Sequence, residues 1–236
     1  MLLGIFGLLP NNLMFPRLMR RNNMTQPDVP EQQSWKALLL EVSKWAKEKK
    51  NNPRSRAACA VIRQGATPFT QVRAYPYVLP AVPEDARPEQ RNALLRVAAL
   101  AAEYDRVPHS SEGKRRNSLG RWAYRVATAE GKNGRSQSVS PDNPGMIAAR
   151  LAYLHTQDME EAARSIKRIF DVASTIPGPV PPVNYFDIAD TLMRWGNGLS
   201  PESQHVRMRV IEEFYSAPQL KVSDQSETVS AEAPEN

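Results

Sequence analysis

Cysteine is nearly absent from this chain of 236 residues, in which Cys59 is the only one. A single cysteine excludes an internal disulfide framework and a zinc site built on thiolates, and it fits a reducing cytosol. Within RAACAVIR, a small buried side chain is a better interpretation of Cys59 than a nucleophile. The three histidines, His109, His155 and His205, are scattered and form no HxH, HExxH or His–Asp pair. The residue types therefore predict no catalytic site, no metal ion and no cofactor.

Motifs that bind nucleotide phosphates are missing as well. The chain has no GxxxxGK[ST] and no GxGxxG. The acidic pairs Glu160–Glu161 and Glu212–Glu213 are adjacent on predicted helices, so their side chains diverge by about 100°. We interpret them as solvated charges that do not share a metal or a proton. Nothing in the sequence thus indicates an enzyme or a small-molecule ligand.

Long apolar runs are also absent, since no segment reaches the roughly 18 unbroken apolar residues of a membrane span. Residues 1–19 resemble a signal sequence superficially, but prolines interrupt them and the cations follow the apolar run. We expect residues 1–33 to be disordered or to be a mispredicted N-terminal extension, with Met24 as the true start. An amphipathic anchor is the alternative. We expect a cytoplasmic protein without membrane contact.

The charge is positive and unevenly distributed. The chain has 31 Lys and Arg against 25 Asp and Glu, a formal net charge of +6, yet no cation follows Lys221. Residues 221–236 are therefore predicted to form an acidic disordered tail. The remaining body is more basic than the total, and such a body most often binds nucleic acid.

Apolar residues recur with the 3.6-residue period of helices along most of the chain. The segment Ser118–Thr128 has Leu119, Trp122, Ala123 and Val126 on one stripe, with Arg121 and Arg125 on another face. Residues 67–83, rich in proline and aromatic residues, are predicted to form an ordered loop without regular helix. The fold class is all-α, with about seven to nine helices. They form one bundle or two packed sub-bundles, with the division within residues 131–144.

Arginine gives the positive functional signal. For each arginine alone, a surface position or a structural ion pair is the better interpretation, but a set on several helices points to phosphate, which matches the arginine fork. Without a helix suited to reading bases, we expect contacts to the nucleic-acid backbone with little sequence preference. The candidate nucleic-acid-binding residues are Arg63, Arg96, Arg121, Arg125, Arg150, Arg164, Lys167 and Arg168.

Several strings resemble, in this order, the CasB family: SLGRWAYRVA, ARLAYLHTQDMEEAARSIKRIFDVA, NYFDIADTLMRW and VRMRVIEEFY. The earlier AYPYVLP and QRNALLRVAALAA also resemble that family, so the resemblance covers about residues 35–217. These proteins are small subunits of the type I-E CRISPR surveillance complex, Cascade, in antiviral defence. The resemblance implies a non-catalytic, all-helical domain over residues 34–220.

The same resemblance implies a set of partners. Two copies of the small subunit lie between the large CasA subunit and the CasC backbone, where a basic surface helps to hold the R-loop of guide RNA and target DNA. Carried over by position, Arg63, Arg96, Arg121 and Arg150 would contact the nucleic-acid backbone. The apolar residues 1–23, the acidic tail, the long 131–144 loop and Thr156 depart from the family pattern.

Two other classes of function are considered. The main alternative is a basic helical adaptor that contacts acidic proteins and binds no nucleic acid, and a metal-dependent nuclease comes third. A steep salt dependence of nucleic-acid binding would favour the first interpretation over the adaptor. Cleavage that depends on divalent cations would favour the nuclease.

Overall fold

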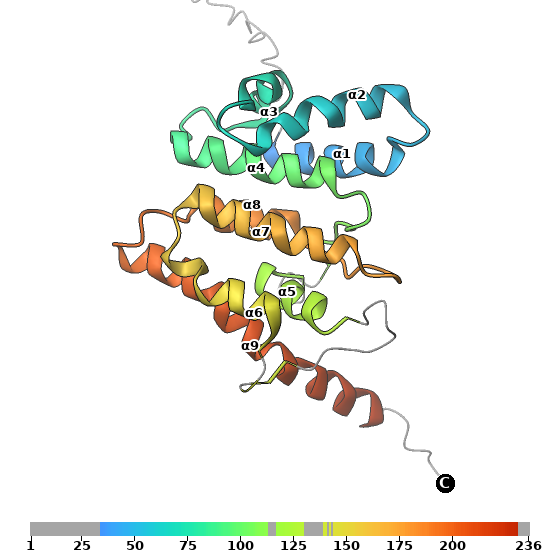
Figure 1. The fold of residues 1–236 in the computed structure, drawn as a ribbon, viewed down its shortest axis with the longest axis vertical. Coiled ribbons are helices and arrows are strands. Elements are labelled where there is room, and N and C mark those ends of the chain that lie inside the picture. The colour runs from blue at the N-terminus through green and yellow to red at the C-terminus, as the bar shows by residue number, and fades with distance from the viewer. Residues whose placement is uncertain (1–33, 113–116, 130–138, 141, 143, 231–236) are drawn as a thin grey trace, which may run out of the picture. The chain divides into compact units, whose positions relative to one another are not determined.

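The computed structural model describes residues 34–112, 117–129, 139–140, 142 and 144–230, which lie within one compact unit, Gln32–Asn236. Across these ranges the chain forms nine α-helices and four short 3-10 helices, without a strand (Figure 1). The predicted all-α fold is confirmed. The predictions for residues 1–33, and for most of the division within residues 131–144, lie outside the described residues.

The first group of helices packs around α4. It consists of α1 (Trp35–Glu48), α2 (Pro53–Ile62), α3 (Tyr75–Val78) and α4 (Pro88–Glu103), at the top of Figure 1. The sequence explains where α1 and α2 begin, because the side chains of Ser34 and Asn52 accept hydrogen bonds from the first backbone N–H groups of these helices. The 3.6-residue spacing predicts an apolar stripe on α1 at Trp35, Leu38, Leu39, Val42, Trp45 and Ala46, and four of these residues are buried: Leu38, Leu39, Val42 and Ala46.

Helix α4 is the centre of this group and is buried on every side. The sequence pattern predicts one inward stripe, at Ala93, Leu94, Val97, Ala98 and Ala101, but each residue from Ala93 to Ala102 is buried. A helix that is apolar all round lies in a core, and α4 packs against α1, α2 and the 3-10 helix η1 (Arg63–Ala66) as well as against α7 and α8. The small alanines permit these close approaches.

The second group contains α5 (Leu119–Ala127), α6 (Gly145–Ala152) and α9 (Pro201–Ser230), and α7 (Met159–Ser174) and α8 (Tyr185–Met193) lie between the two groups (Figure 1). Asp158 with Glu161 three residues later predicts a capping box at the start of α7. The side chain of Asp158 accepts a hydrogen bond from the backbone N–H of Glu161, so the cap is confirmed. Trp122, Phe170 and Tyr185 bring α5, α7 and α8 together in the core.

The prediction for residues 67–83 is wrong, because this segment contains the 3-10 helices η2 (Gln71–Ala74) and η3 (Leu79–Ala81) and one turn of α-helix, α3. Pro76 and Pro80 stand in the first turns of α3 and η3. The first N–H groups of a helix have no partner inside the helix, so a proline there costs no hydrogen bond. Proline density therefore limits helix length here but does not exclude helix.

Two helix ends also differ from those predicted. The sequence pattern predicts a helix that continues to His155, but α6 ends at Ala152 and a 3-10 turn, η4 (Leu154–Thr156), follows it. Helix α9 extends to Ser230, beyond residue 221, where the sequence predicts the start of an acidic disordered tail. Disorder of the tail stays a prediction. No helix in the described part of the chain is both long enough and apolar enough to cross a membrane.

Candidate nucleic-acid interface

Helix α7 presents a basic face to solvent. Its apolar stripe, which includes Ile166, Ile169 and Phe170, is buried. Arg164 and Arg168 lie one turn apart on the opposite side, and both are exposed. Arg164 has a weak contact of 4.0 Å with Glu161, whereas Arg168 has no hydrogen bond or ion pair with the described residues. These two guanidinium groups are placed to meet an anion.

Lys167, the third predicted residue of this stripe, is already engaged inside the protein. Its Nζ lies 3.0 Å from Oε1 of Glu103 and donates to the hydroxyl of Tyr104 at 2.6 Å, with Asp171 at 3.5 Å. The hydroxyl of Tyr104 in turn donates to Asp171, and burial is the main cause that raises the pKa of Tyr104. Lys167 therefore joins α7 to the end of α4, and its side chain stays partly exposed to solvent.

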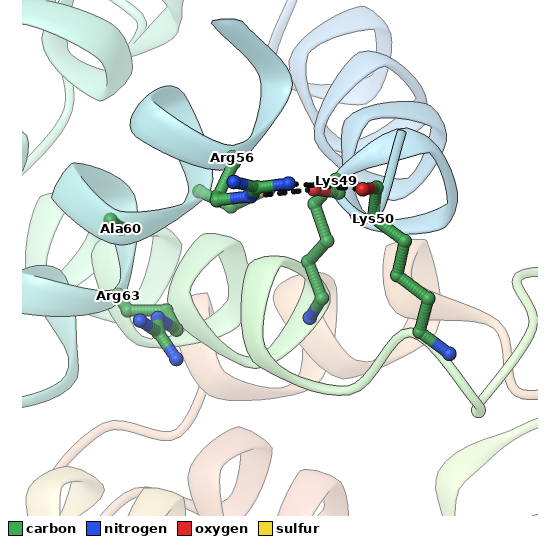
Figure 2. Close-up of a pocket in the computed structure, with 6 residues that line it drawn as sticks. Lys49, Lys50, Arg56, Ala60 and Arg63 are labelled. Atoms are coloured by element: carbon green, nitrogen blue, oxygen red, sulfur yellow. Dashed lines mark hydrogen bonds between the residues drawn. The ribbon is translucent and has the colours of Figure 1, made fainter. Parts of the chain in front are cut away.

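A basic pocket of about 440 Å³ opens where α1 meets α2 (Figure 2). The guanidinium of Arg56 donates to the backbone carbonyls of Lys49 and Lys50, at 3.0 Å each. Arg63 is exposed and has no hydrogen bond or ion pair with the described residues. The pocket is lined by Lys49, Lys50, Arg56, Cys59, Ala60 and Arg63.

The pocket and α7 meet at the end of α4. Nζ of Lys49 donates to the backbone carbonyl of Glu103 at 2.9 Å, and Lys167 pairs with the carboxylate of the same residue. Cations are favoured at this helix end because the last carbonyls carry partial negative charge. We group the cations of the pocket with those of α7, which Lys167 connects through Glu103, and name them the α2–α7 basic surface: Lys49, Lys50, Arg56, Arg63, Arg164, Lys167 and Arg168.

Acidic groups neutralise only part of this surface. Asp105 lies 3.7 Å from Nζ of Lys49 and 3.6 Å from Nζ of Lys50. The side chain of Lys50 is nevertheless 77% exposed, so water screens that pair strongly. Arg63 and Arg168 are exposed, and neither has a counter-ion among the described residues. Glu103 and Asp171 also lie against Lys167, and Glu161 lies near Arg164. Seven cations thus face four acidic groups in the described part of the chain, so the surface keeps a smaller excess of positive charge that a polyanion can neutralise.

Arg96 does not belong to this surface, because it is 3% exposed. Its guanidinium pairs with Glu160 on α7 at 2.7 Å and donates to the carbonyl of Gly65 at 2.5 Å and to Gln71 at 2.8 Å. All three nitrogens thus have partners within the protein. The predicted phosphate contact is not available to this side chain, and Arg96 instead holds η1 and α7 against α4.

Arg121 and Arg125, predicted to face solvent, are half-buried. Nη2 of Arg125 donates to Asn117 and to the carbonyl of Pro182, at 2.7 and 2.8 Å. Arg121 interacts with Glu213 of α9, where its charge opposes the rise in the pKa of that carboxyl. Both arginines therefore connect α5 to neighbouring segments.

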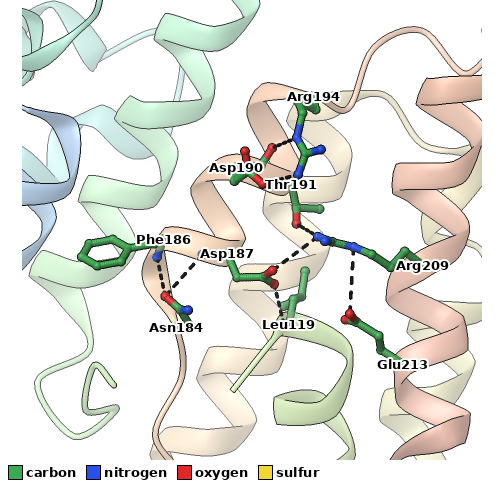
Figure 3. Close-up of polar contacts among 9 residues, drawn as sticks. All are labelled: Leu119, Asn184, Phe186, Asp187, Asp190, Thr191, Arg194, Arg209 and Glu213. Atoms are coloured by element: carbon green, nitrogen blue, oxygen red, sulfur yellow. Dashed lines mark hydrogen bonds and ion pairs between the residues drawn. The ribbon is translucent and has the colours of Figure 1, made fainter. Parts of the chain in front are cut away.

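The polar contacts around α5 are centred on Asp187 of α8 (Figure 3). Its carboxylate accepts a hydrogen bond from the backbone N–H of Leu119 at 2.9 Å, which caps α5, and Arg209 lies 3.4 Å away. Burial raises the pKa of Asp187 and of Glu213 above their usual values. Buried carboxylates with arginine neighbours form a structural network here, between α5, α8 and α9.

Arg150 of α6 is half-buried and belongs to neither set. Its Nη1 is buried and has no hydrogen-bond partner among the described residues. No hydrogen bond or ion pair in the described part of the chain joins Arg150 to the α2–α7 basic surface. Of the eight predicted residues, the structure therefore gathers four on one surface: Arg63, Arg164, Lys167 and Arg168.

Sequence reasoning missed three cations of the pocket, namely Lys49, Lys50 and Arg56. The run KEKKNNP predicts the end of a helix, and the structure places its cations at the corner between α1 and α2, which begins at Pro53. Cys59 is buried beside the pocket, as its small side chain within RAACAVIR predicts. Burial raises the pKa of its thiol, although Lys49 and Arg63 oppose the rise, so the group is a weak nucleophile at neutral pH. The described residues contain no group of three or more metal-ligating side chains.

Comparison with known proteins identifies the family. The family model of CRISPR-associated protein Cse2 matches residues 56–215, more than half of the chain. No curated protein sequence gives a significant match. Among solved structures, the chain is similar to a CRISPR-associated protein of the Cse2 family from Thermus thermophilus, at 26% identity and a TM-score of 0.52, over 76% of this chain and 98% of that one.

Two further structures agree on the fold. CasB from Thermus thermophilus is 26% identical, with a TM-score of 0.51 over 76% of this chain and 98% of that one. A chain of a CRISPR RNA-guided surveillance complex is 21% identical, with a TM-score of 0.54 over 81% of this chain and 96% of that one. The chain therefore belongs to the Cse2 family of CRISPR-associated proteins, the CasB family that its sequence resembles.

Proposed function

We propose that this chain is a non-catalytic small subunit of a type I-E CRISPR Cascade complex in the cytoplasm. Its α2–α7 basic surface binds the nucleic-acid backbone and stabilises the R-loop in antiviral defence. The observation that carries the proposal is a basic surface built from the end of α1 and from α2, η1 and α7, on which Arg63 and Arg168 are exposed without a counter-ion among the described residues. Membership of the Cse2 family and the likeness to a chain of a surveillance complex support it.

Electrostatic attraction explains how such a surface can stabilise an R-loop without catalysing a reaction. Formation of an R-loop exchanges a DNA duplex for a heteroduplex of nearly equal stability, so modest contacts to the phosphates can decide the balance. Each neutralised phosphate also releases counter-ions, which makes binding weaken as salt increases. The partners in this proposal are the CasA and CasC subunits, a second copy of the chain and the guide RNA–target DNA R-loop, without a membrane, a metal or a small-molecule ligand.

One observation favours the adaptor alternative. Lys49 and Lys167 already bind acidic or carbonyl groups inside the protein, so fewer cations of the surface are left for phosphates. On an adaptor, the other exposed cations of the surface would meet acidic proteins, and binding to nucleic acid would be weak. The two proposals therefore differ in the salt dependence of nucleic-acid affinity. A metal-dependent nuclease would instead show cleavage after addition of Mg²⁺ or Mn²⁺.

The test measures affinity for a mixed-sequence duplex at several salt concentrations, for the full chain and for the double variant Arg63→Gln/Arg168→Gln. We expect weaker binding and a slope of log affinity against log salt that is smaller by about 0.9 per lost contact, thus about 1.8 for the pair. Arg194→Gln is the matched control, since Arg194 is exposed but pairs with Asp190 on α8. A double variant with the slope of the unmodified chain would refute the proposed surface.

A further inference from the structure

The turn between η1 and η2 holds Phe69 out in solvent. Phe69 is 96% exposed, more than any other large apolar side chain of the described residues. Its position follows from the turn itself, because Thr67 and Thr70 on either side form the hydrogen bonds that close it. An aromatic ring in this position has both faces free for a ligand.

The backbone that carries Phe69 is firmly held. The N–H groups of Thr70 and Gln71 donate to the carbonyl of Thr67, at 3.3 and 3.1 Å. The hydroxyl of Thr70 donates to the carbonyl of Gln64 at 2.6 Å, and the side chain of Gln71 accepts from the buried Arg96. The ring therefore stands on a base that is tied to the core, so little ordering of the backbone opposes binding.

Cations flank the ring on both sides in the sequence. Arg63 begins η1 and Arg73 lies in η2, and both side chains are exposed. The hydrogen bond from Thr70 to Gln64 joins the residue after Phe69 to the residue after Arg63, which brings these two positions close together. The two 3-10 helices also pack against each other. Phe69 is thus an aromatic group at the edge of the α2–α7 basic surface.

We infer that Phe69 stacks on an unpaired base of single-stranded nucleic acid, while Arg63 and Arg73 bind the adjoining phosphates. The inference rests on the proposed function and names its partner class. Exposed aromatic rings beside cations bind single strands with little sequence preference, because every base has a π-face. The bases of a duplex are stacked on each other, so the ring discriminates in favour of a displaced strand.

A second exposed apolar side chain, Val72, lies three residues from Phe69 and is 65% exposed. A partner protein with an apolar pocket could use this pair. Two exposed arginines near the ring favour a polyanion instead, since burial of their charges in an apolar pocket would require acidic partners. Single-stranded nucleic acid supplies both the apolar face and the anions.

The experiment compares the full chain with Phe69→Ala for binding to one labelled single strand and to its duplex, both of mixed sequence. We expect about 5- to 140-fold weaker binding of the single strand, which corresponds to about 1–3 kcal/mol for one stacked base. Duplex affinity and the salt slope should not change, because no charge is lost. Phe69→Trp should retain the affinity for the single strand.

Tyr153→Ala is the matched control, since Tyr153 is an exposed aromatic residue after α6, at 69% exposure. It should bind both probes as the unmodified chain does. Equal binding of the single strand by Phe69→Ala and the unmodified chain would overturn the inference while leaving the proposed function intact. If Phe69→Ala binds the single strand normally but no longer assembles into Cascade, Phe69 contacts a partner protein instead, and the inference is overturned. Absence of any salt-dependent binding by the unmodified chain would overturn both proposals.

Discussion

Arginines that look alike in the sequence have opposite roles in the structure. Arg96 and Arg207 are buried, at 3% and 5% exposure. Arg207 donates to the carbonyls of His155, Trp195 and Gly196, as Arg96 does to Gly65. Arg168, in contrast, is exposed on α7. A guanidinium can satisfy buried carbonyls or external phosphates, since its five donors suit both.

Replacement of Arg96 should destabilise the protein without a specific effect on binding. Arg96→Ala leaves Glu160 without its cation and the carbonyl of Gly65 without its donor. Loss of one partner of a buried pair costs about 3–5 kcal/mol, and we expect about 3 kcal/mol because Glu160 is partly exposed. Urea unfolding measures this, with Arg168→Ala as a control that should change the free energy of unfolding by less than about 0.5 kcal/mol. If Arg96→Ala keeps the stability of the unmodified chain but loses nucleic-acid binding, Arg96 contacts nucleic acid and this prediction is wrong.

The limits of sequence prediction follow from such residues. Helical periodicity predicted the all-α fold correctly, because apolar stripes and caps are local features of the sequence, as at Asp158 of α7, but it missed the one-turn helix α3. It could not distinguish Arg96 from Arg164, since burial depends on which helix packs above each side chain. The pocket at Arg56 and Lys49 joins two helices, so only the folded structure reveals it.

At the scale of elements, the contact between α5 and α9 depends on one glycine. A Cβ at Gly120 would lie 2.2 Å from the carbonyl oxygen of Val210 and 2.8 Å from Cβ of Glu213. Real Cβ atoms do not approach backbone oxygen so closely, and a carbonyl inside α9 cannot move alone. The absence of a side chain at Gly120 therefore sets the distance between these two helices.

Gly120→Ala should separate α5 from α9. Overpacking costs about 1–3 kcal/mol or more and should exceed the roughly 1 kcal/mol that alanine gains over glycine in helix propensity. We expect a net loss of at least about 1 kcal/mol in the free energy of unfolding. Gly178→Ala is the control, because a Cβ there meets no atom within 4 Å. Equal stability of the two variants would show that α5 can shift freely over α9.

The same interface should respond to pH through Glu213. Burial raises the pKa of this carboxyl, although Ser118, Arg209 and Arg121 lower it, and Asp187 adds to the rise. A group with a raised pKa binds more protons in the folded state, so its contribution to stability is full below about pH 4 and decreases as the pH rises through its folded pKa. As the pH rises from about 4 to about 7, the unmodified chain should therefore lose stability relative to Glu213→Gln, as measured by the difference between their free energies of unfolding. A constant difference across this range would contradict the raised pKa.

At the scale of the whole molecule, the two groups of helices have different tasks in our interpretation. The α2–α7 basic surface combines exposed cations from the first group and from α7. In the second group, Arg121 and Arg125 are half-buried and interact with neighbouring elements. The CasB resemblance assigned phosphate contacts to both groups, because position in the sequence does not show which arginines are engaged within the protein.

Charge reversal in each group separates binding from stability. Arg164→Glu/Arg168→Glu changes exposed side chains, so its melting temperature should stay within about 2 °C of that of the unmodified chain. Its salt slope for nucleic acid should decrease by at least about 1.4–1.8, which is the loss of two phosphate contacts. Assembled into Cascade, this variant should accept guide RNA but form shorter-lived R-loops.

Arg121→Glu/Arg150→Glu should behave in the opposite way. A carboxylate at position 121 would face Glu213, whose pKa burial already raises, and one at position 150 would occupy a half-buried site. Like charges that are partly removed from water repel strongly. We expect a loss of about 3 kcal/mol, which lowers the melting temperature by about 6–12 °C in a chain of this size. Nucleic-acid binding per folded molecule should keep its salt slope. A variant that melts normally but loses slope would place the phosphate contacts on α5 and α6 and would refute this division of tasks.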